Sequence, residues 1–267
     1  MINPLHKVEI ARYELFHPNV GDADGLVIAQ LSDIHMGRWV KPRHLRQLVE
    51  WVNETAPDLV ALTGDYVGYN KRDVDRCVDE LDQLVAPSFA VLGNHDHWTD
   101  GARARRAFNE SSIELMSNES VLFADDRLRL VGVDDQVTGN ADVGRAFGDV
   151  GGERFCLTLN HVPSIAPDCV GAGADLVLSG HTHNFQFNIP TVTNALATRL
   201  GAKYCAGPYR IDDSYLYINR GLGSASWPRR IRALPEVTYI TLRHSDDNIR
   251  LELVESMFRA VEHRLRA

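Results

Sequence analysis

The sequence predicts an α/β fold in which two β-sheets pack face to face and helices cover the outside. Short apolar runs that end in polar turns recur along the chain, and helical patterns separate the first three of them. Strand, helix and strand in alternation is typical of a mostly parallel sheet. The middle and the tail of the chain hold further strand-like runs, which indicate a second sheet.

The predicted core strands are short apolar runs that each lead into a turn rich in Asp, Asn or His. They span residues 26–31, 58–62, 89–92, 155–159 and 176–178. Continuous apolar runs this short fit strands that are buried on both faces. We therefore expect these segments in the centre of the sheets.

Helices are predicted between the first three runs, because apolar side chains there recur at helical spacing. Residues 44–53 and 74–85 each place an apolar stripe on one face. Residues 121–123 and 128–133 flank Asp125 and Asp126 and predict a hairpin. The tail adds strand-like runs at residues 215–218, 237–242 and 249–254.

Two later segments carry hypotheses of their own. Residues 185–211 are irregular and rich in Pro and Gly, and a long loop in a compact domain is often functional, so we predict a cover over the substrate pocket. The C-terminal segment carries an apolar stripe at helical spacing, formed by Leu253, Met257, Phe258, Val261 and Leu265. This stripe predicts a helix, either docked on the core or lying on a membrane surface.

Composition limits the classes of function. The net charge is -8, whereas nucleic-acid binders usually carry a basic excess, so a nucleic-acid partner is disfavoured. The four cysteines form no C-x-x-C pair, which favours free thiols. With no signal-peptide pattern and no long apolar run, the interpretation is a single domain over residues 1–267 in the cytoplasm, with peripheral contact to the inner membrane face left open.

Eight groups with metal-binding chemistry follow the five core strands. Because ligand sites in open α/β sheets form at the carboxyl ends of the strands, we expect these groups to meet at one edge. Each motif alone fits a helix cap or a turn, but five in one chain point to a common site. The groups are Asp33, His35, Asp65, Asn94, His95, His161, His181 and His183.

Oxygen from Asp and Asn and nitrogen from His suit hard to borderline divalent metals. A carboxylate such as Asp65 can bridge two cations. Two metals roughly 3.5–4 Å apart can clamp the attacking and leaving oxygens of an in-line displacement and lower the pKa of a bound water. The pattern therefore predicts a dinuclear phosphoester hydrolase.

These motifs, in this order, resemble the calcineurin-like metallophosphoesterase superfamily over about residues 26–242. The resemblance implies a four-layer αββα sandwich with two mixed β-sheets. It further implies one metal on Asp33, His35, Asp65 and His183, and a second on Asp65, Asn94, His161 and His181. By the same resemblance, His95 would stabilise the transition state or protonate the leaving oxygen, and Asp96 would orient it.

Residues 216–224 and 235–237 look like a bacterial branch with phosphodiesterases and UDP-2,3-diacylglucosamine pyrophosphatases. Tyr66 after Gly64-Asp65 departs from the protein phosphatases, and Gly68 departs from the purple acid phosphatases. Asn184 and Phe185 stand where members of this branch commonly have two glycines, so the chain departs from the branch beside the predicted metals.

The sequence thus predicts a phosphodiesterase or pyrophosphatase that uses metal-bound hydroxide on a small or lipid-linked phosphoester. A phosphomonoesterase and a non-catalytic scaffold with the same fold are the alternatives. Manganese, iron or zinc fit the ligands, with manganese favoured for activity. Three further features are candidate helpers, with solvated or supporting roles as the alternative: Arg38, the cluster of Arg229, Arg230 and Arg232, and His97.

Overall fold

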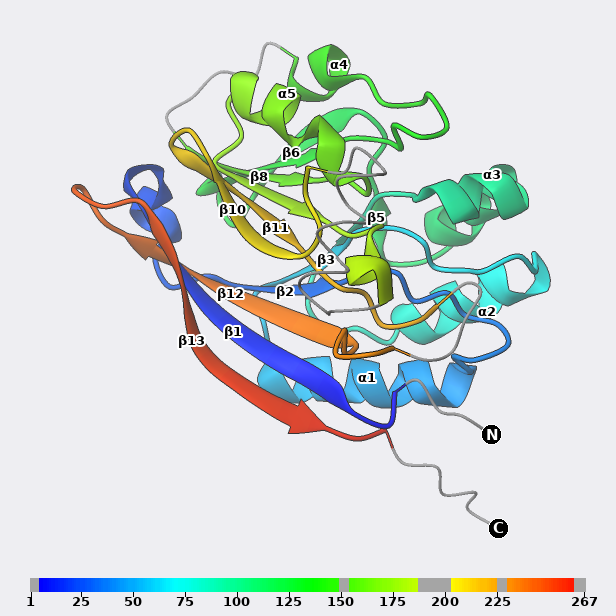
Figure 1. The fold of residues 1–267 in the computed structure, drawn as a ribbon. Helices are drawn as coiled ribbons and strands as arrows, with labels where there is room; N and C mark the ends of the chain where they lie inside the picture. Colours follow the sequence, from blue (N-terminus) through cyan, green and yellow to red (C-terminus); the bar gives the residue numbers. More distant parts are fainter. Residues whose placement is uncertain (1–4, 149–153, 187–202, 225–229, 262–267) are drawn as a thin grey trace.

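The computed structural model describes residues 5–148, 154–186, 203–224 and 230–261. Within these ranges the chain forms a four-layer α/β sandwich, in which two mixed β-sheets are flanked by helices (Figure 1). The fold class predicted from the sequence is confirmed.

The first sheet has seven strands and combines parallel and antiparallel neighbours. Strands β2 to β5 run parallel, β12 is antiparallel to β2, and β1 lies parallel to β12. In spatial order the strands are β13 (Arg250–Arg259), β1 (Val8–His17), β12 (Glu236–His244), β2 (Val27–Leu31), β3 (Leu59–Leu62), β4 (Ser88–Ala90) and β5 (Glu114–Leu115).

The second sheet has six strands, and its four central strands are parallel. The outer strands β10 and β6 pair antiparallel with their neighbours. In spatial order the strands are β10 (Gly207–Ile211), β11 (Ser214–Ile218), β9 (Leu176–Ser179), β8 (Phe155–Leu159), β7 (Leu128–Gly132) and β6 (Glu119–Phe123).

Helices cover the outer face of each sheet (Figure 1). On the seven-stranded sheet lie α1 (Pro42–Thr55), α2 (Arg72–Leu81) and α3 (Asn94–Asn109), and on the six-stranded sheet lie α4 (Val143–Phe147) and α5 (Ala166–Gly171). Short 3-10 turns complete the described elements: η1 (Pro18–Ala23), η2 (Pro163–Ile165) and η3 (His183–Gln186).

Three hydrophobic clusters fill the three spaces between the four layers. The first joins α1, α2 and α3 to the seven-stranded sheet, with Leu48 and Leu62 as members. The second lies between the sheets, where Ile28 and Leu157 are fully buried. The third joins α4 and α5 to the six-stranded sheet. Apolar burial on both faces of each central strand explains why the strands read as continuous apolar runs.

The predicted helices at residues 44–53 and 74–85 are confirmed as α1 and α2, although α2 ends earlier, at Leu81. Pro42 opens α1 in the first turn, where a missing N–H costs nothing. The predicted hairpin is confirmed as the antiparallel pair β6 and β7.

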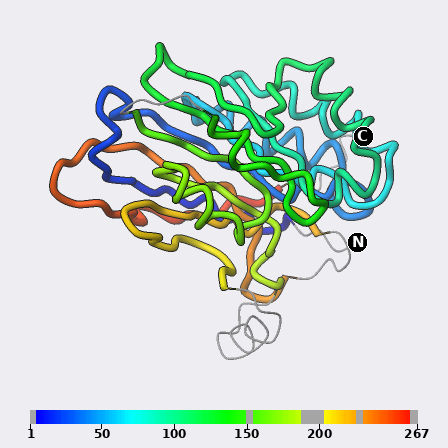
Figure 2. The backbone as a smooth tube through the Cα atoms, turned by 90° about the horizontal axis from the view of Figure 1, so that it is seen from above, coloured from blue at the N-terminus to red at the C-terminus, as the bar shows by residue number. Residues whose placement is uncertain are grey.

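The prediction of a C-terminal helix is wrong for the described residues. Residues Arg250–Arg259 form strand β13, which pairs antiparallel with β1 from Val8↔Arg259 to Phe16↔Arg250. Leu253, Met257 and Phe258 of the predicted stripe are 55%, 40% and 51% exposed, so their helical spacing does not reflect burial. Leu265 lies outside the described residues. Figure 2 shows the N-terminal and C-terminal strands running side by side.

The predicted pocket cover falls largely outside the described residues, because 187–202 are not described. At its end, Gly207–Ile211 is not loop but edge strand β10. Among the described residues, no helix combines the length and apolar character needed to span a bilayer.

Candidate metal centre

The turns after β2, β3, β4, β8 and β9 meet at one place between the two sheets. Within the seven-stranded sheet, the backbone N–H of Asp33 donates to the carbonyl of Gly64 (2.9 Å), which aligns two of these turns. Within the six-stranded sheet, the N–H of Gly180 donates to the carbonyl of His161 (3.0 Å). The seven residues predicted as metal ligands stand in these turns or just after them, and Asn94 and His95 open α3 while His183 opens η3.

Five of the seven predicted ligands have left-handed backbone conformations. The φ angles are 48° at Asp33, 46° at His35, 57° at Asp65, 70° at His181 and 50° at His183. Each such residue costs about 1–3 kcal/mol, and the conformation persists only where the surrounding structure enforces it. Strain gathered at one point is typical of functional sites.

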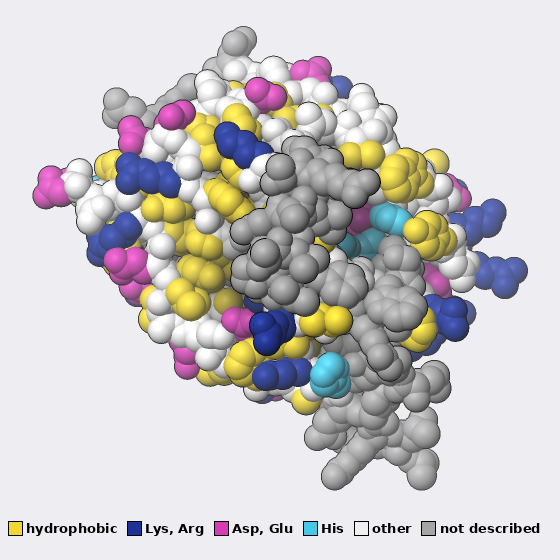
Figure 3. All heavy atoms as spheres, viewed as in Figure 1, with side chains coloured by type: hydrophobic (Ala, Val, Ile, Leu, Met, Phe, Trp, Pro, Cys, Tyr) yellow, Lys and Arg dark blue, Asp and Glu magenta, His cyan; other side chains and the backbone are white. Residues whose placement is uncertain are grey.

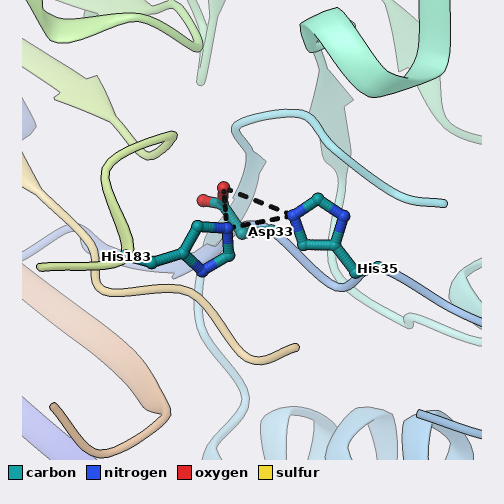
Figure 4. Close-up of side chains that lie close together, drawn as sticks. All are labelled: Asp33, His35 and His183. Carbon is teal, nitrogen blue, oxygen red and sulfur yellow. Dashed lines mark hydrogen bonds and ion pairs between the residues drawn. The ribbon is translucent and has the colours of Figure 1, made fainter. Parts of the chain in front are cut away.

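The first cluster joins Asp33, His35 and His183, whose side chains point toward one another (Figure 4). The Nε2 atoms of His35 and His183 lie 3.0 Å apart, and His183 Nε2 lies 3.2 Å from Asp33 Oδ1. His35 Nε2 is 4.0 Å from the same oxygen. One cation could contact all three groups.

The second cluster joins Asp65, His161 and His181. His161 Nε2 lies 3.2 Å from Asp65 Oδ2 and 3.3 Å from His181 Nδ1. The same Asp65 oxygen is 3.5 Å from His35 Nε2, which belongs to the first cluster. Asp65 therefore stands between the two clusters, where a bridging carboxylate would be placed.

Electrostatics in the site favour the neutral, metal-binding form of two imidazoles and concentrate negative charge around a third. Burial is the main reason why the pKa values of His35 and His181 are lowered to about 4, so both rings are neutral at pH 7. At His161, burial lowers the pKa, but the carboxylates of Asp65 and Asp33 outweigh it and raise the value to about 10. The paired buried carboxylates thus attract positive charge.

Asn94 provides a test of whether the residues fit a metal. Its side chain is 2% exposed, and its Oδ1 atom has no hydrogen-bond partner among the described residues. A buried carbonyl oxygen without a partner costs about 1–3 kcal/mol. A cation at this point would satisfy it, so the donor set fits a pair of divalent ions.

Supporting groups that the sequence interpretation missed orient several of these ligands. His161 Nδ1 donates to the carbonyl of Thr63 (2.7 Å), which in the neutral ring leaves Nε2 free to bind a metal. The Ser32 hydroxyl donates to Asp33 Oδ2 (2.6 Å). Ser and Thr beside a ligand carry no distinctive sequence signal, so only the structure identifies them.

Gly180 allows the two sheets to approach each other at the site. A Cβ atom at Gly180 would overlap the side chains of Ser32 and Asp33, which belong to the other sheet. The backbone N–H of His181 donates to Asp33 Oδ2 at 3.0 Å. A side chain at position 180 would prevent this contact.

His95 stands beside the first cluster with its ring half-buried. Its Nδ1 atom donates to the carbonyl of Gly68 (3.1 Å), and its backbone N–H donates to Asp65 Oδ1 (2.9 Å). The ring centroid lies 4.9 Å from that of His35. In this tautomer Nε2 remains free to exchange a proton with a substrate.

Asp96 occupies a different position from the one the sequence interpretation gave it. Its carboxylate accepts backbone N–H bonds from Asp65, Tyr66 and Gly93, each at 2.9 Å, and from Val67 at 3.3 Å. Both oxygens are therefore engaged by the turns that carry Asp65 and Asn94. Asp96 therefore holds these two turns in place, and the hypothesis that it orients the His95 ring is revised.

Two of the predicted helpers have other surroundings than expected. Arg230 does not extend into solvent: its Nη2 atom lies 2.9 Å from His183 Nδ1, and its guanidinium also donates to the carbonyl of Arg220 at 2.7 Å. His97 contacts Asp134, with Nε2 2.8 Å from Asp134 Oδ1. Arg229 lies outside the described residues.

A sandwich of two mixed sheets with Asp, Asn and His at the strand ends defines a candidate metallohydrolase. A family model described as calcineurin-like phosphoesterase matches residues 26–185, more than half of the chain, and this range holds every predicted ligand. The chain therefore belongs to the calcineurin-like phosphoesterase family, which makes it a hydrolase of phosphoesters.

Three curated relatives agree with this family. The chain is 28% identical over 231 residues to the uncharacterised metallophosphoesterase YkuE of Bacillus subtilis, which covers 84% of this chain and 81% of that protein. It is 29% identical over 253 residues to the phosphodiesterase YaeI of Escherichia coli, and the match covers 89% of this chain and 91% of that protein. It is 26% identical over 272 residues to the UDP-2,3-diacylglucosamine pyrophosphatase LpxG of Chlamydia trachomatis, and the match covers 80% of this chain and 82% of that protein.

Among solved structures, a dimetal phosphatase from Danio rerio has a TM-score of 0.52 at 11% identity. The match covers 90% of this chain and 100% of that chain. At this level of identity the likeness concerns the fold alone, and it agrees with the four-layer sandwich.

Proposed function

We propose that the protein hydrolyses phosphodiester or pyrophosphate links with the help of two divalent cations. The observation that carries this proposal is the position of Asp65 Oδ2, which lies 3.5 Å from His35 Nε2 and 3.2 Å from His161 Nε2. One carboxylate oxygen thus faces both ligand clusters. A shared carboxylate is the arrangement that two neighbouring cations require.

In this proposal each cation has ligands from both sheets. Bound there, the two cations would supply positive charge that polarises the phosphoryl oxygens and lowers the pKa of the attacking water. The first ligand set is Asp33, His35, Asp65 and His183, and the second is Asp65, Asn94, His161 and His181.

His95 is the proposed proton donor to the leaving oxygen. The Gly68 carbonyl fixes the proton of the neutral ring on Nδ1, so Nε2 can take up a proton and deliver it. Asp65 Oδ1 holds the His95 backbone at 2.9 Å, which ties the proton donor to the bridging residue. The leaving oxygen therefore has a proton source beside the site where its negative charge develops.

The choice of diester and pyrophosphate over monoester is supported by the names of two relatives, a phosphodiesterase and a pyrophosphatase. Phosphomonoester hydrolysis remains the second candidate. A non-catalytic scaffold is disfavoured, because a silent site has no need for the buried, unpartnered Asn94 oxygen or for five strained residues in three turns. Manganese is the proposed metal, although affinity order alone favours zinc at such a donor set.

A metal-dependence experiment tests the proposal. The purified protein is stripped with EDTA, dialysed and assayed with bis-p-nitrophenyl phosphate and p-nitrophenyl phosphate, with and without added Mn²⁺, Fe²⁺ or Zn²⁺. We expect turnover of the diester only after metal is added, with Mn²⁺ giving the highest rate and two ions per chain by elemental analysis. Activity that survives complete chelation, or one ion per chain at saturation, would contradict the proposal.

A further inference from the structure

A cavity of about 490 Å³ opens beside His35, on one side of the candidate metal centre. Besides His35, its walls include the basic residues Arg38, Lys41 and Arg76 and the aromatic residue Tyr69. The turn after β2, the turn after β3 and helix α2 supply these walls. The cavity therefore continues the metal centre rather than standing apart from it.

The charge of this cavity is opposite to that of the protein. Three basic residues and one acidic residue, Asp73, line it, whereas the whole chain has a net charge of -8. Asp73 lies 3.7 Å from Arg76 and offsets it in part. Arg38 is exposed, its guanidinium lies over the Trp39 ring at 4.6 Å, and among the described residues it forms no ion pair. Lys41 donates to the Gly37 carbonyl (2.7 Å) and keeps two further N–H groups for a ligand.

The position of His95 shows which half of a substrate would enter this cavity. The carbonyl that holds His95 Nδ1 belongs to Gly68, which lines the cavity. The ring of Tyr69, which also lines it and is 70% exposed, lies 5.1 Å from the His95 ring. A proton donor must stand next to the oxygen that leaves, so the cavity lies on the leaving-group side.

We propose that this cavity is a subsite for the leaving half of the substrate, and that it takes a leaving group with a negative charge of its own. The chemical class is the phosphomonoester released when a pyrophosphate link is cut. The inference rests on the proposed function and narrows it from diesters in general to pyrophosphate diesters. Histidine side chains (cyan) are visible on the face shown in Figure 3, with hydrophobic and basic side chains beside them.

The reaction balances without a further reagent. Water supplies the new oxygen on one phosphorus, the bond between that same phosphorus and the bridging oxygen breaks, and the bridging oxygen leaves with the other phosphorus, so that two phosphomonoesters form. The two protons of the water pass to the products or to solvent. A departing phosphate gains negative charge as the bond breaks, and Arg38 and Lys41 are placed to stabilise that charge more strongly than the charge of the intact substrate.

The experiment compares two substrates on the metal-loaded full chain. Diadenosine diphosphate releases a charged phosphomonoester whichever phosphorus is attacked, whereas the aryl group of bis-p-nitrophenyl phosphate carries no charge in the substrate. The measured quantity is the ratio of kcat/KM for the first substrate to kcat/KM for the second. The variants are Arg38→Ala with Lys41→Ala, the conservative Arg38→Lys, and Arg106→Ala as a control on an exposed arginine of α3 outside this cavity.

We expect the double variant to lower this ratio about tenfold or more, which is the size expected for the loss of charge-assisted hydrogen bonds. The single variant Arg38→Lys should keep most of the wild-type ratio, and Arg106→Ala should leave the ratio unchanged. Inhibition by adenosine monophosphate, the released product, should weaken by a similar factor in the double variant. Thermal melting of each variant verifies the fold.

Two results would overturn the inference alone: hydrolysis of the aryl diester with no cleavage of diadenosine diphosphate, or an unchanged ratio in the double variant. Failure of the metal-loaded wild-type protein on both substrates would instead overturn the proposed function, and the subsite with it. The two failures are therefore distinguishable.

Discussion

The two sheets contribute different chemistry to the candidate metal centre. The seven-stranded sheet provides all the oxygen donors, Asp33, Asp65 and Asn94, together with one imidazole, His35. The six-stranded sheet provides imidazoles only, from the turns after β8 and β9. Neither sheet alone could surround a cation, so the centre exists only because the sheets pack together.

Each sheet also orients the ligands of the other. The Thr63 carbonyl, after β3, fixes the ring of His161, which follows β8. In the opposite direction, the backbone N–H of His181, after β9, donates to the carboxylate of Asp33, after β2. Ligand placement therefore depends on the interface between the two sheets, and substitutions at single positions test this dependence.

The largest effect is expected from Asp65→Asn, which removes the charge that faces both clusters while keeping the shape of the side chain. Both metal sites should weaken. Turnover of bis-p-nitrophenyl phosphate should fall on the order of 10⁴-fold, because several kcal/mol of charge stabilisation are lost and each 1.36 kcal/mol of barrier corresponds to about a tenfold change in rate. Elemental analysis and kinetics measure both effects. Asp247→Asn, an exposed position, is the control, and full metal content in Asp65→Asn would refute the bridging position.

A smaller effect is expected from His95→Gln, because His95 stands on the oxygen-rich side without being a proposed ligand. Turnover should fall on the order of 10²–10³-fold, the usual contribution of general acid catalysis. Metal content should remain at two ions per chain, in contrast to Asp65→Asn. A lost ion would show that His95 is a ligand, and a near-normal rate would reject its role as proton donor.

The smallest effect is expected from Asp134→Asn, which weakens a link between the sheets. Asp134 follows β7 and accepts hydrogen bonds from His97 and Arg105 of α3, at 2.8 Å each. Burial raises the pKa of this carboxyl, but hydrogen bonds from His97, Arg105 and Ser117 outweigh it and hold the pKa well below its usual value.

A lowered pKa stabilises the folded state above the ordinary pKa, and this stabilisation is lost as the pH falls. Asp134→Asn should therefore lower the free energy of unfolding by about 1–3 kcal/mol at pH 7. The difference in free energy of unfolding between the variant and the wild-type protein should narrow below about pH 4, where Asp in the unfolded chain is protonated. Urea unfolding of both proteins from pH 7 to below pH 4 measures this difference. A difference that does not change with pH would contradict the ionic contribution of Asp134.

The sequence was sufficient to predict the fold class and the residues that meet at the site. Core strands buried on both faces give unbroken apolar runs, and the polar residues after each run stand out against them. His161 and Asp65, almost a hundred positions apart, were placed together for this reason, and the structure brings them to 3.2 Å.

Edge strands and supporting contacts were harder to predict. The strand β1 mixes charged and apolar residues and shows no clear strand pattern. In β13 the first half is correctly predicted as a strand, whereas the four-residue spacing of Leu253 and Met257 wrongly predicts a helix over the second half. Backbone pairing with β1 decides its structure, and pairing leaves no trace in side-chain periodicity. The four N–H groups around Asp96 are equally invisible in the sequence, since backbone donors are the same in every residue.

The left-handed turns have a consequence for how this site could change over generations. Glycine, Asn, Asp and His tolerate that backbone conformation better than most residues, and three of these, Asn, Asp and His, are also proposed metal ligands here. At Asp33, Asp65 and His181 a drift to a β-branched residue would cost folding as well as metal binding. Descendants that abandon catalysis but keep the fold should therefore carry Asn or Gly at these three positions.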